Sequence, residues 1–160
     1  SPIVFKKTTS FMLSSNAVSK SSSIFSMCKQ KTMSNLTTSG IQISVKPFFR
    51  SDLSDVPKLQ YFFNYHIEIE NTNNFDVKLL SRNWYIFDSL HESRYVSGEG
   101  VVGEQPILKP NEKFTYTSGA DLQSELGMMQ GFYTFCNLID GSTFEVSVPS
   151  FLMEYPYKLN

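Results

Sequence analysis

One glycine-rich stretch carries the residues whose types and spacing could do chemistry. Gly98, Gly100 and Gly103 form the pattern G-x-G-x-x-G, which in nucleotide-binding proteins marks a loop whose backbone N–H groups hold phosphate oxygens. A loop of this kind would bind pyrophosphate or a nucleotide, and Arg82 and Arg94 are candidates for the balancing positive charge. These five residues are the candidate ligand-binding residues.

The residues around the glycines do not fit a dinucleotide-binding unit, in which the loop opens a helix. Pro106 and Pro110 follow Gly103 closely, so no helix of useful length can begin there, and no P-loop sequence is present. Glu99 and Glu104 flank the loop and would repel phosphate. Two interpretations remain: an anion-binding nest of N–H groups without a helix, or a structural loop whose glycines let the chain cross tightly between two sheets.

No catalytic or metal-binding constellation accompanies this motif. His66 shares one face of a predicted strand with Glu68 and Glu70, but no second His or Cys lies at ligand spacing. A hydrolase would need paired carboxylates or a metal cluster, and neither histidine offers one. The two cysteines form no disulfide framework or C-x-x-C pair, which is typical of a reducing compartment. We therefore predict a non-enzyme with no catalytic residue, metal or cofactor.

Charge divides the chain into two unlike parts. Residues 1–51 contain seven basic residues and no acid, whereas residues 52–160 contain seven basic and fifteen acidic residues. An acidic body is a poor surface for a phosphate backbone, so we predict no direct nucleic-acid binding by the domain. No apolar run approaches the roughly 18–20 residues that cross a bilayer, which predicts a soluble protein without a transmembrane segment.

Residues 1–35 read as a basic N-terminal extension rich in Ser and Lys. This composition resembles that of an organellar transit peptide, which predicts a mitochondrial location. Arginine is absent from the extension, which is unusual for a transit peptide. The alternatives are that residues 1–35 form a flexible tail or a docking arm used in a larger assembly. Without an organellar signal the protein would be cytoplasmic or nuclear.

Residues 36–160 alternate in the manner of short strands separated by turn signals. The clearest strand places Phe63, Tyr65, Ile67 and Ile69 on one face. We expect about seven strands, near residues 41–45, 60–71, 77–88, 94–96, 113–117, 129–138 and 144–148. Many short strands without a helix of normal length predict an all-β, antiparallel two-sheet sandwich of immunoglobulin or fibronectin-III type.

Three features make this fold testable in detail. Trp84 is the only tryptophan and should lie in the core between the sheets. Arg82, two residues away, would be partly buried and would need a carboxylate, backbone carbonyls or an anionic ligand. Asp140-Gly141 predicts a two-residue type I′ turn.

Several motifs together resemble the ApaG domain family over residues 36–158. The quoted motifs are Trp84-Tyr85-Ile86-Phe87-Asp88, Gly98-x-Gly100-Val101-Val102-Gly103-x-Gln105-Pro106, Phe114-x-Tyr116-Thr117-Ser118-Gly119 and Gly127-x-Met129-x-Gly131-x-Tyr133. Asn111 departs from the family, which usually has Gly at that position. Residues 1–35 match nothing in it.

The resemblance implies a fibronectin-III-like sandwich with no established enzymatic activity. For bacterial members it implies links to magnesium and cobalt homeostasis and to dinucleoside polyphosphates, with nucleotide or pyrophosphate binding proposed for the glycine motif. For eukaryotic members it implies protein–protein interaction, as in F-box proteins and a partner of DNA polymerase delta. We therefore expect an interaction or structural module, such as an accessory subunit of a multi-subunit organellar complex. Anion binding by the glycine loop is the alternative.

Overall fold

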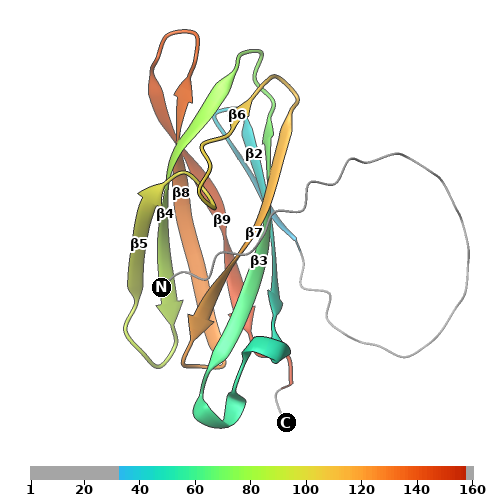
Figure 1. Cartoon of the computed structure of the whole chain (residues 1–160), viewed down its shortest axis with the longest axis vertical. Helices are drawn as coiled ribbons and strands as arrows, with labels where there is room; N and C mark the ends of the chain where they lie inside the picture. Colours follow the sequence, from blue (N-terminus) through green and yellow to red (C-terminus); the bar gives the residue numbers. More distant parts are fainter. Residues whose placement is uncertain (1–32, 158–160) are drawn as a thin grey trace, which may run out of the picture.

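A computed structural model describes residues 33–157, which form nine strands in two antiparallel sheets facing each other (Figure 1). The strands are β1 (Ser34–Thr38), β2 (Ile41–Phe49), β3 (Tyr61–Asn71), β4 (Val77–Asp88), β5 (Arg94–Glu99), β6 (Ile107–Leu108), β7 (Lys113–Leu122), β8 (Leu126–Asn137) and β9 (Thr143–Glu154). Two short 3-10 helices, Ser51–Leu53 and Val56–Lys58, join β2 to β3, and the described residues contain no α-helix. Most of the predicted extension lies outside the described residues.

The two sheets have the orders β1-β2-β3-β7 and β5-β4-β8-β9, and β6 pairs with the beginning of β4. Strands β1 and β2 lie against β9 on one side of the sandwich. On the other side β5 and β7 are the outer strands of their sheets. No helix in the described part of the chain could span a membrane. The predicted all-β antiparallel sandwich is confirmed.

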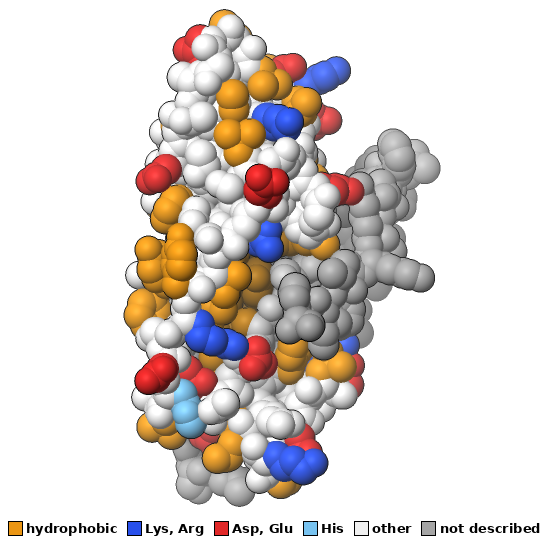
Figure 2. Space-filling model, turned by 60° about the vertical axis from the view of Figure 1, so that its left-hand side comes forward, with side chains coloured by type: hydrophobic (Ala, Val, Ile, Leu, Met, Phe, Trp, Pro, Cys, Tyr) orange, Lys and Arg blue, Asp and Glu red, His pale blue; other side chains and the backbone are white. Residues whose placement is uncertain are grey.

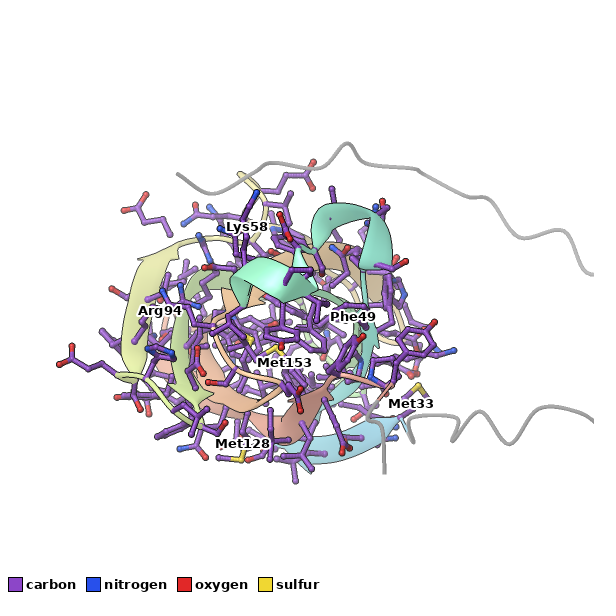
Figure 3. The ribbon with its side chains drawn as sticks, turned by 90° about the horizontal axis from the view of Figure 1, so that it is seen from below. Met33, Phe49, Lys58, Arg94, Met128 and Met153 are labelled. Atoms are coloured by element: carbon purple, nitrogen blue, oxygen red, sulfur yellow. The ribbon has the colours of Figure 1, made fainter. Side chains whose placement is uncertain are left out.

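Alternating side chains build the core between the sheets. Phe63, Tyr65, Ile67 and Ile69 are all buried, as the period of β3 predicts. Trp84 lies inside, with its ring centroid 5.5 Å from that of Tyr65. In Figure 3, Met153 of β9 lies in the interior, whereas Met128 of β8 lies on the outer side of the sheet.

The strands are longer and more numerous than predicted. Strand β1 lies in a stretch without a clear period, and its two-residue turn uses Ser39 and Gly40, both at positive φ. Strand β2 continues through Pro47, two residues beyond the part of it that pairs with β1. A proline is tolerated where a strand has a free edge.

The predicted type I′ turn at Asp140-Gly141 is wrong. Gly141 has a φ of 74°, but Asp140 is not at positive φ. Instead the Asp140 carboxylate accepts hydrogen bonds from the backbone N–H and the hydroxyl of Ser142, at 2.9 and 2.6 Å. The side chain therefore organises a longer loop, which the Asn137 N–H closes by donating to the Ser142 carbonyl at 2.8 Å.

Candidate functional site

The glycine motif forms a tight hairpin after β5 (Figure 1). The Val101 N–H donates to the Glu104 carbonyl at 2.8 Å, and the Glu104 N–H donates back to Val101 at 3.0 Å. Val102 and Gly103 occupy the tip with φ values of 50° and 76°, and positive φ at both central residues is what a type I′ turn requires. The chain then passes through β6, at the beginning of β4, and enters β7 of the other sheet. The connection therefore crosses between the sheets, as predicted, although the glycine hairpin itself turns beside the sheet of β4 and β5.

Arg82 is held by the carbonyl groups of this loop. Its Nη1 donates to the carbonyls of Glu99 and Gly100, at 3.0 and 2.8 Å. Gly98 lies opposite Arg82 in the β4–β5 register, and a Cβ there would lie 3.1 Å from Nη1. Gly98 therefore leaves room for the guanidinium to lie over β5. The sequence predicted a carboxylate, backbone carbonyls or an anionic ligand as the partner of Arg82, and backbone carbonyls are observed.

Gly100 is required by a close backbone approach. Its φ is 60°, and a Cβ there would lie 2.2 Å from the Glu104 carbonyl oxygen. Its N–H donates to the Leu80 carbonyl at 2.8 Å. Together with the two turn hydrogen bonds, three N–H groups of the glycine stretch are engaged within the protein. The Val102 and Gly103 N–H groups, at the tip, have no hydrogen-bond partner among the described residues.

Arg94 lies at the far end of β5 from the loop, about 13 Å from Gly98 at the usual rise of a strand. Its Nη1 contacts Asp121 Oδ1 of β7 at 3.0 Å, and Nη2 donates to the Asp121 carbonyl. Figure 3 shows Arg94 on the β5 side of the sandwich, away from Met33. The structure thus brings together the three glycines and Arg82, and it uses Arg94 as a bridge between the sheets.

Three tyrosines in the interior lie close enough to Arg82 for its charge to act on them. The Tyr116 and Tyr133 hydroxyls hydrogen-bond to each other across the two sheets. Burial raises the pKa of Tyr116, Tyr133 and Tyr65, and the Arg82 charge opposes that rise. These phenols therefore stay protonated at neutral pH and serve as packing groups.

No metal-binding cluster of three or more His, Cys, Asp or Glu residues occurs within the described residues. The His66 ring instead lies 3.0 Å from the Thr117 hydroxyl. Lys113 forms ion pairs with Glu68 at 2.9 Å and Glu70 at 3.5 Å. The face of β3 with His66, Glu68 and Glu70 is thus a solvated strand face whose polar side chains contact those of β7.

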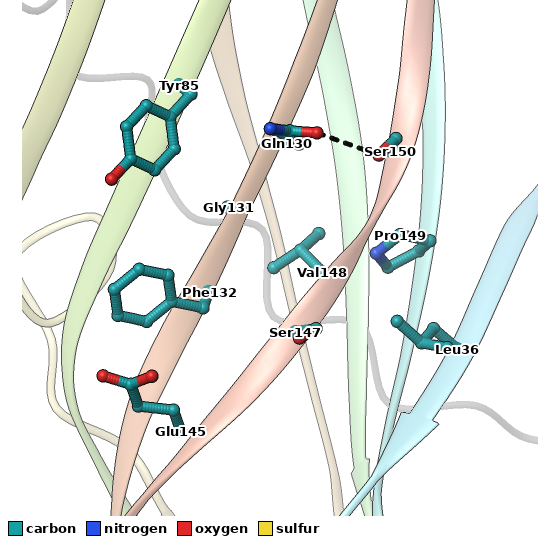
Figure 4. A pocket seen from close by; sticks show the side chains of 10 residues that line it. All are labelled: Leu36, Tyr85, Gln130, Gly131, Phe132, Glu145, Ser147, Val148, Pro149 and Ser150. Carbon is teal, nitrogen blue, oxygen red and sulfur yellow. Dashed lines mark hydrogen bonds between the residues drawn. The ribbon is translucent and has the colours of Figure 1, made fainter.

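A second candidate site lies on the outer face of the five-stranded sheet. A groove of about 410 Å³ runs over β4, β8 and β9 and is completed by Leu36 of β1 (Figure 4). Tyr85 and Phe132 line one side, and Pro149 lies on the other. Gln130 and Ser150 lie between them at one end.

A β-bulge produces this groove. Met129 pairs with Phe151 and Gly131 with Val148, so Gln130 alone opposes the two residues Pro149 and Ser150. Proline cannot donate to the ladder, and bulges are one of the few places where a sheet accepts it.

Most polar side-chain groups in the groove have no partner among residues 33–157. The Ser150 hydroxyl is 3.5 Å from Gln130 Oε1, but Gln130 Nε2 has no partner in the described part of the chain. The same holds, within residues 33–157, for the Tyr85 and Ser147 hydroxyls and the Glu145 carboxylate. Groups of this kind are free to bind a ligand.

Tyr95 holds the aromatic side of the groove in place. Its ring centroid lies 4.9 Å from that of Tyr85, and its hydroxyl donates to Asn83 Oδ1 at 2.5 Å. None of the predicted site residues lies in this groove, although Tyr85 and Gly131 belong to the family motifs. The available signal was a second, outward-facing set of aromatic residues on two neighbouring strands, since Tyr85 and Phe132 both alternate with buried residues.

Comparison with known proteins identifies the family. The family model described as "ApaG domain" matches residues 51–137, more than half of the chain. Protein ApaG of Methylorubrum extorquens is 42% identical over 120 residues, covering 75% of this chain and 92% of that protein. Protein ApaG of Paramagnetospirillum magneticum is 37% identical, covering 79% and 96%.

Solved structures agree with this assignment. The crystal structure of a Bordetella pertussis protein described as ApaA superposes with a TM-score of 0.70 at 38% identity, covering 74% of this chain and 95% of that one. A second crystal structure, at 33% identity, gives a TM-score of 0.69. The chain therefore belongs to the ApaG domain family.

Proposed function

We propose that this domain is a non-catalytic protein-interaction module whose binding surface is the outer face of the five-stranded sheet. The observation that carries the proposal is the groove at the bulge, where an ordered aromatic pair lies beside unpaired polar groups. Aromatic side chains are enriched at protein–protein interfaces, and polar groups beside them can pair with groups of a partner. The ApaG family is not a known enzyme family.

Charge on the domain supports a protein partner over a nucleic acid. Basic and acidic side chains are interspersed on the face seen in Figure 2, without a continuous basic surface. Apolar side chains gather between them on the same face. Electrostatic attachment to a phosphate backbone needs a concentrated positive surface.

The same proposal includes the extension. Five lysines without an acid in residues 1–35 favour an organellar protein, mitochondrial in our proposal, that works as an accessory subunit of a larger complex. The extension could anchor the domain in that complex while the groove binds a subunit. The acidic remainder of the chain gives the two parts opposite charge for docking.

Size-exclusion chromatography of the tagged full chain from native mitochondrial extract tests this function. We expect the wild type to migrate with a larger complex, and the Tyr85→Ala/Phe132→Ala variant to migrate as a free chain. Leu152→Ala is the matched control, because Leu152 is exposed on the neighbouring part of β9 outside the groove. A wild type that migrates as a monomer at every salt concentration would overturn the proposal, and so would a groove variant that stays in the complex.

Anion binding at the tip of the glycine loop is the second candidate. The observation in its favour is the pair of N–H groups at Val102 and Gly103, which have no partner within residues 33–157. Isothermal titration with pyrophosphate, with and without magnesium, tests it. Heat at millimolar ligand that disappears on reversal of Arg82 to Glu in a folded variant supports it, and no heat rejects it.

A further inference from the structure

We propose that the groove binds an extended, proline-rich peptide that carries a basic residue at one end. This inference rests on the proposed function and names the class of partner. Four features of the groove indicate this class of peptide: the main-chain pairing of its floor, its length, its hydrogen-bond donors and the single charged residue that lines it.

The floor of the groove offers no strand edge to a ligand. Its floor is β8, which pairs with β4 on one side and with β9 on the other along its length. Strand β9 is the last strand of its sheet, and its outer edge lies beside β1, away from this floor. A peptide that lies on this floor is therefore recognised through side chains, and the usual modes are then a helix in a hydrophobic groove or a polyproline II segment.

The shape and lining of the groove favour polyproline II over a helix. From Glu145 to Ser150 the groove follows five residue steps of β9, or about 16 Å, the length of about five residues of polyproline II at 3.1 Å each. A helix would need a continuous apolar stripe for its anchors, whereas the apolar groups here are interrupted by Gln130 and Ser147. Phe132 and Pro149 provide flat apolar surfaces on which proline rings pack (Figure 4).

Hydrogen-bonding capacity in the groove matches a proline-rich chain. Tyr85, Gln130 and Ser147 offer O–H or N–H donors that have no partner among the described residues. A polyproline II segment has no internal hydrogen bonds, and its prolines carry carbonyl acceptors but no N–H. A groove that supplies donors satisfies such a peptide without leaving unpaired peptide N–H groups.

Charge fixes the direction of the peptide. Glu145 is the single charged residue that lines the groove, and Figure 4 shows it next to Phe132 at one end. A Lys or Arg side chain can lay its apolar stem along the Phe132 ring and place its cation at the carboxylate. The basic residue of the partner therefore lies at the Glu145 end, and the prolines lie toward Tyr85 and Ser150.

Tyr95 is a positioning residue for this site. It stacks on Tyr85 and is itself oriented by its hydrogen bond to Asn83. Removing only its hydroxyl, in Tyr95→Phe, frees the ring while keeping its apolar area. We expect weaker peptide binding with an unchanged preference for a basic end, because Glu145 is untouched.

Titration of the isotope-labelled full chain with three synthetic peptides, followed by NMR, tests the inference. The probes are Lys-Pro-Pro-Ala-Pro-Pro, the same peptide with Glu in place of Lys, and a Gly-Ser peptide of equal length. We expect the Lys peptide to shift the Gln130 side-chain amide and the backbone signals of residues 130–132 and 147–150. Tyr85→Ala and Gln130→Ala should each weaken binding about tenfold or more, and Leu152→Ala should not.

Glu145→Gln separates the charge from the rest of the site. We expect it to weaken the Lys peptide about threefold to tenfold and to abolish the preference for Lys over Glu. The inference is overturned if no peptide shifts these signals at millimolar concentration, or if the Gly-Ser peptide binds as well as the proline peptide. If the peptides fail while co-migration still depends on Tyr85 and Phe132, the proline-rich partner is rejected and the interaction function stands.

Discussion

The glycine loop and the outer groove belong to the same sheet but treat their polar groups in opposite ways. In the loop, the guanidinium of Arg82 donates to two carbonyls, and the N–H groups of Gly100, Val101 and Glu104 are engaged internally. In the groove, donors and a carboxylate from three strands have no partner within the described residues. The segment that stands out in the sequence therefore uses most of its hydrogen-bonding groups to stabilise its own conformation.

The backbone of the glycine loop is also more strained than the backbone of the groove. Val102 is β-branched yet has a φ of 50° at the loop tip, which costs of the order of 1–3 kcal/mol. The turn hydrogen bonds and the Arg82 contacts offset that cost. The groove residues lie on regular strands interrupted by one bulge, so they are positioned without comparable strain. A conspicuous motif can thus be a structural device, and a binding surface can lie on ordinary strands.

Substitution of the loop glycines should give the largest effects. We expect Gly100→Ala to reduce the free energy of unfolding by about 3 kcal/mol, because a Cβ there meets the Glu104 carbonyl at 2.2 Å as well as carrying a positive φ. Gly103→Ala, with no atom within 4 Å of its Cβ, should cost about 1 kcal/mol from backbone strain alone. Urea denaturation measures both. Equal losses at the two positions would contradict the structural role assigned to the loop.

The tyrosine pair beneath the loop should respond to the loss of one hydroxyl. Tyr116→Phe leaves the Tyr133 hydroxyl unpaired in the core and should cost about 2 kcal/mol at pH 7. Replacing both residues with Phe should restore most of that loss, because neither hydroxyl is then unsatisfied. If the double variant is less stable than the single variant, the two tyrosine hydroxyls are not each other's hydrogen-bond partners.

Alkaline pH should act through the same pair. Burial raises the pKa of Tyr116 and Tyr133 in the folded state above the ordinary value, so their contribution to stability is complete below about pH 10 and falls as the unfolded chain ionises above it. Denaturation midpoints at pH 8, 10 and 11 measure this. The Phe/Phe variant is the control and should lose less stability between pH 10 and 11 than the wild type.

Arg82 and Gly98 should be energetically coupled. We expect Arg82→Met to cost about 2 kcal/mol, because two carbonyls lose a charged donor. Gly98→Ala should cost about 1 kcal/mol in the wild type, since its Cβ would press on the guanidinium, and close to nothing when Arg82 is absent. A double-mutant cycle from denaturant unfolding gives the coupling. Additive losses would show that Gly98 is required for another reason.

Substitution of Arg94 should reduce the free energy of unfolding less than substitution of Arg82. Its side chain is 43% exposed and its partner Asp121 is 69% exposed, so the ion pair is largely screened by solvent. We expect Arg94→Gln to cost less than about 1 kcal/mol. Thermal unfolding at low and high salt measures it, and a loss as large as that of Arg82→Met would remove the distinction between the two residues.

The alternation of side chains predicted most of the fold. Strong two-residue periods located β3 and β4, and turn residues marked the ends of most other strands. Strands β1 and β6 escaped because their formation depends on neighbours: β1 on the edge of β2, and β6 on Val77 and Lys78 at the beginning of β4. Asn111 stands where the family usually has Gly and has a φ of 64°, which Asn tolerates better than most residues.

The sequence by itself determined the sheet-forming segments, the core faces and the family, because side-chain period, turn chemistry and a specific motif are local properties of the chain. The tertiary structure decided what those segments do. It placed Arg82 beside the glycine loop through the β4–β5 register and opened a groove where Pro149 lies in a bulge beside β8. Both depend on pairing between residues distant in sequence, and the pairing determines which polar groups are satisfied internally and which remain for a partner.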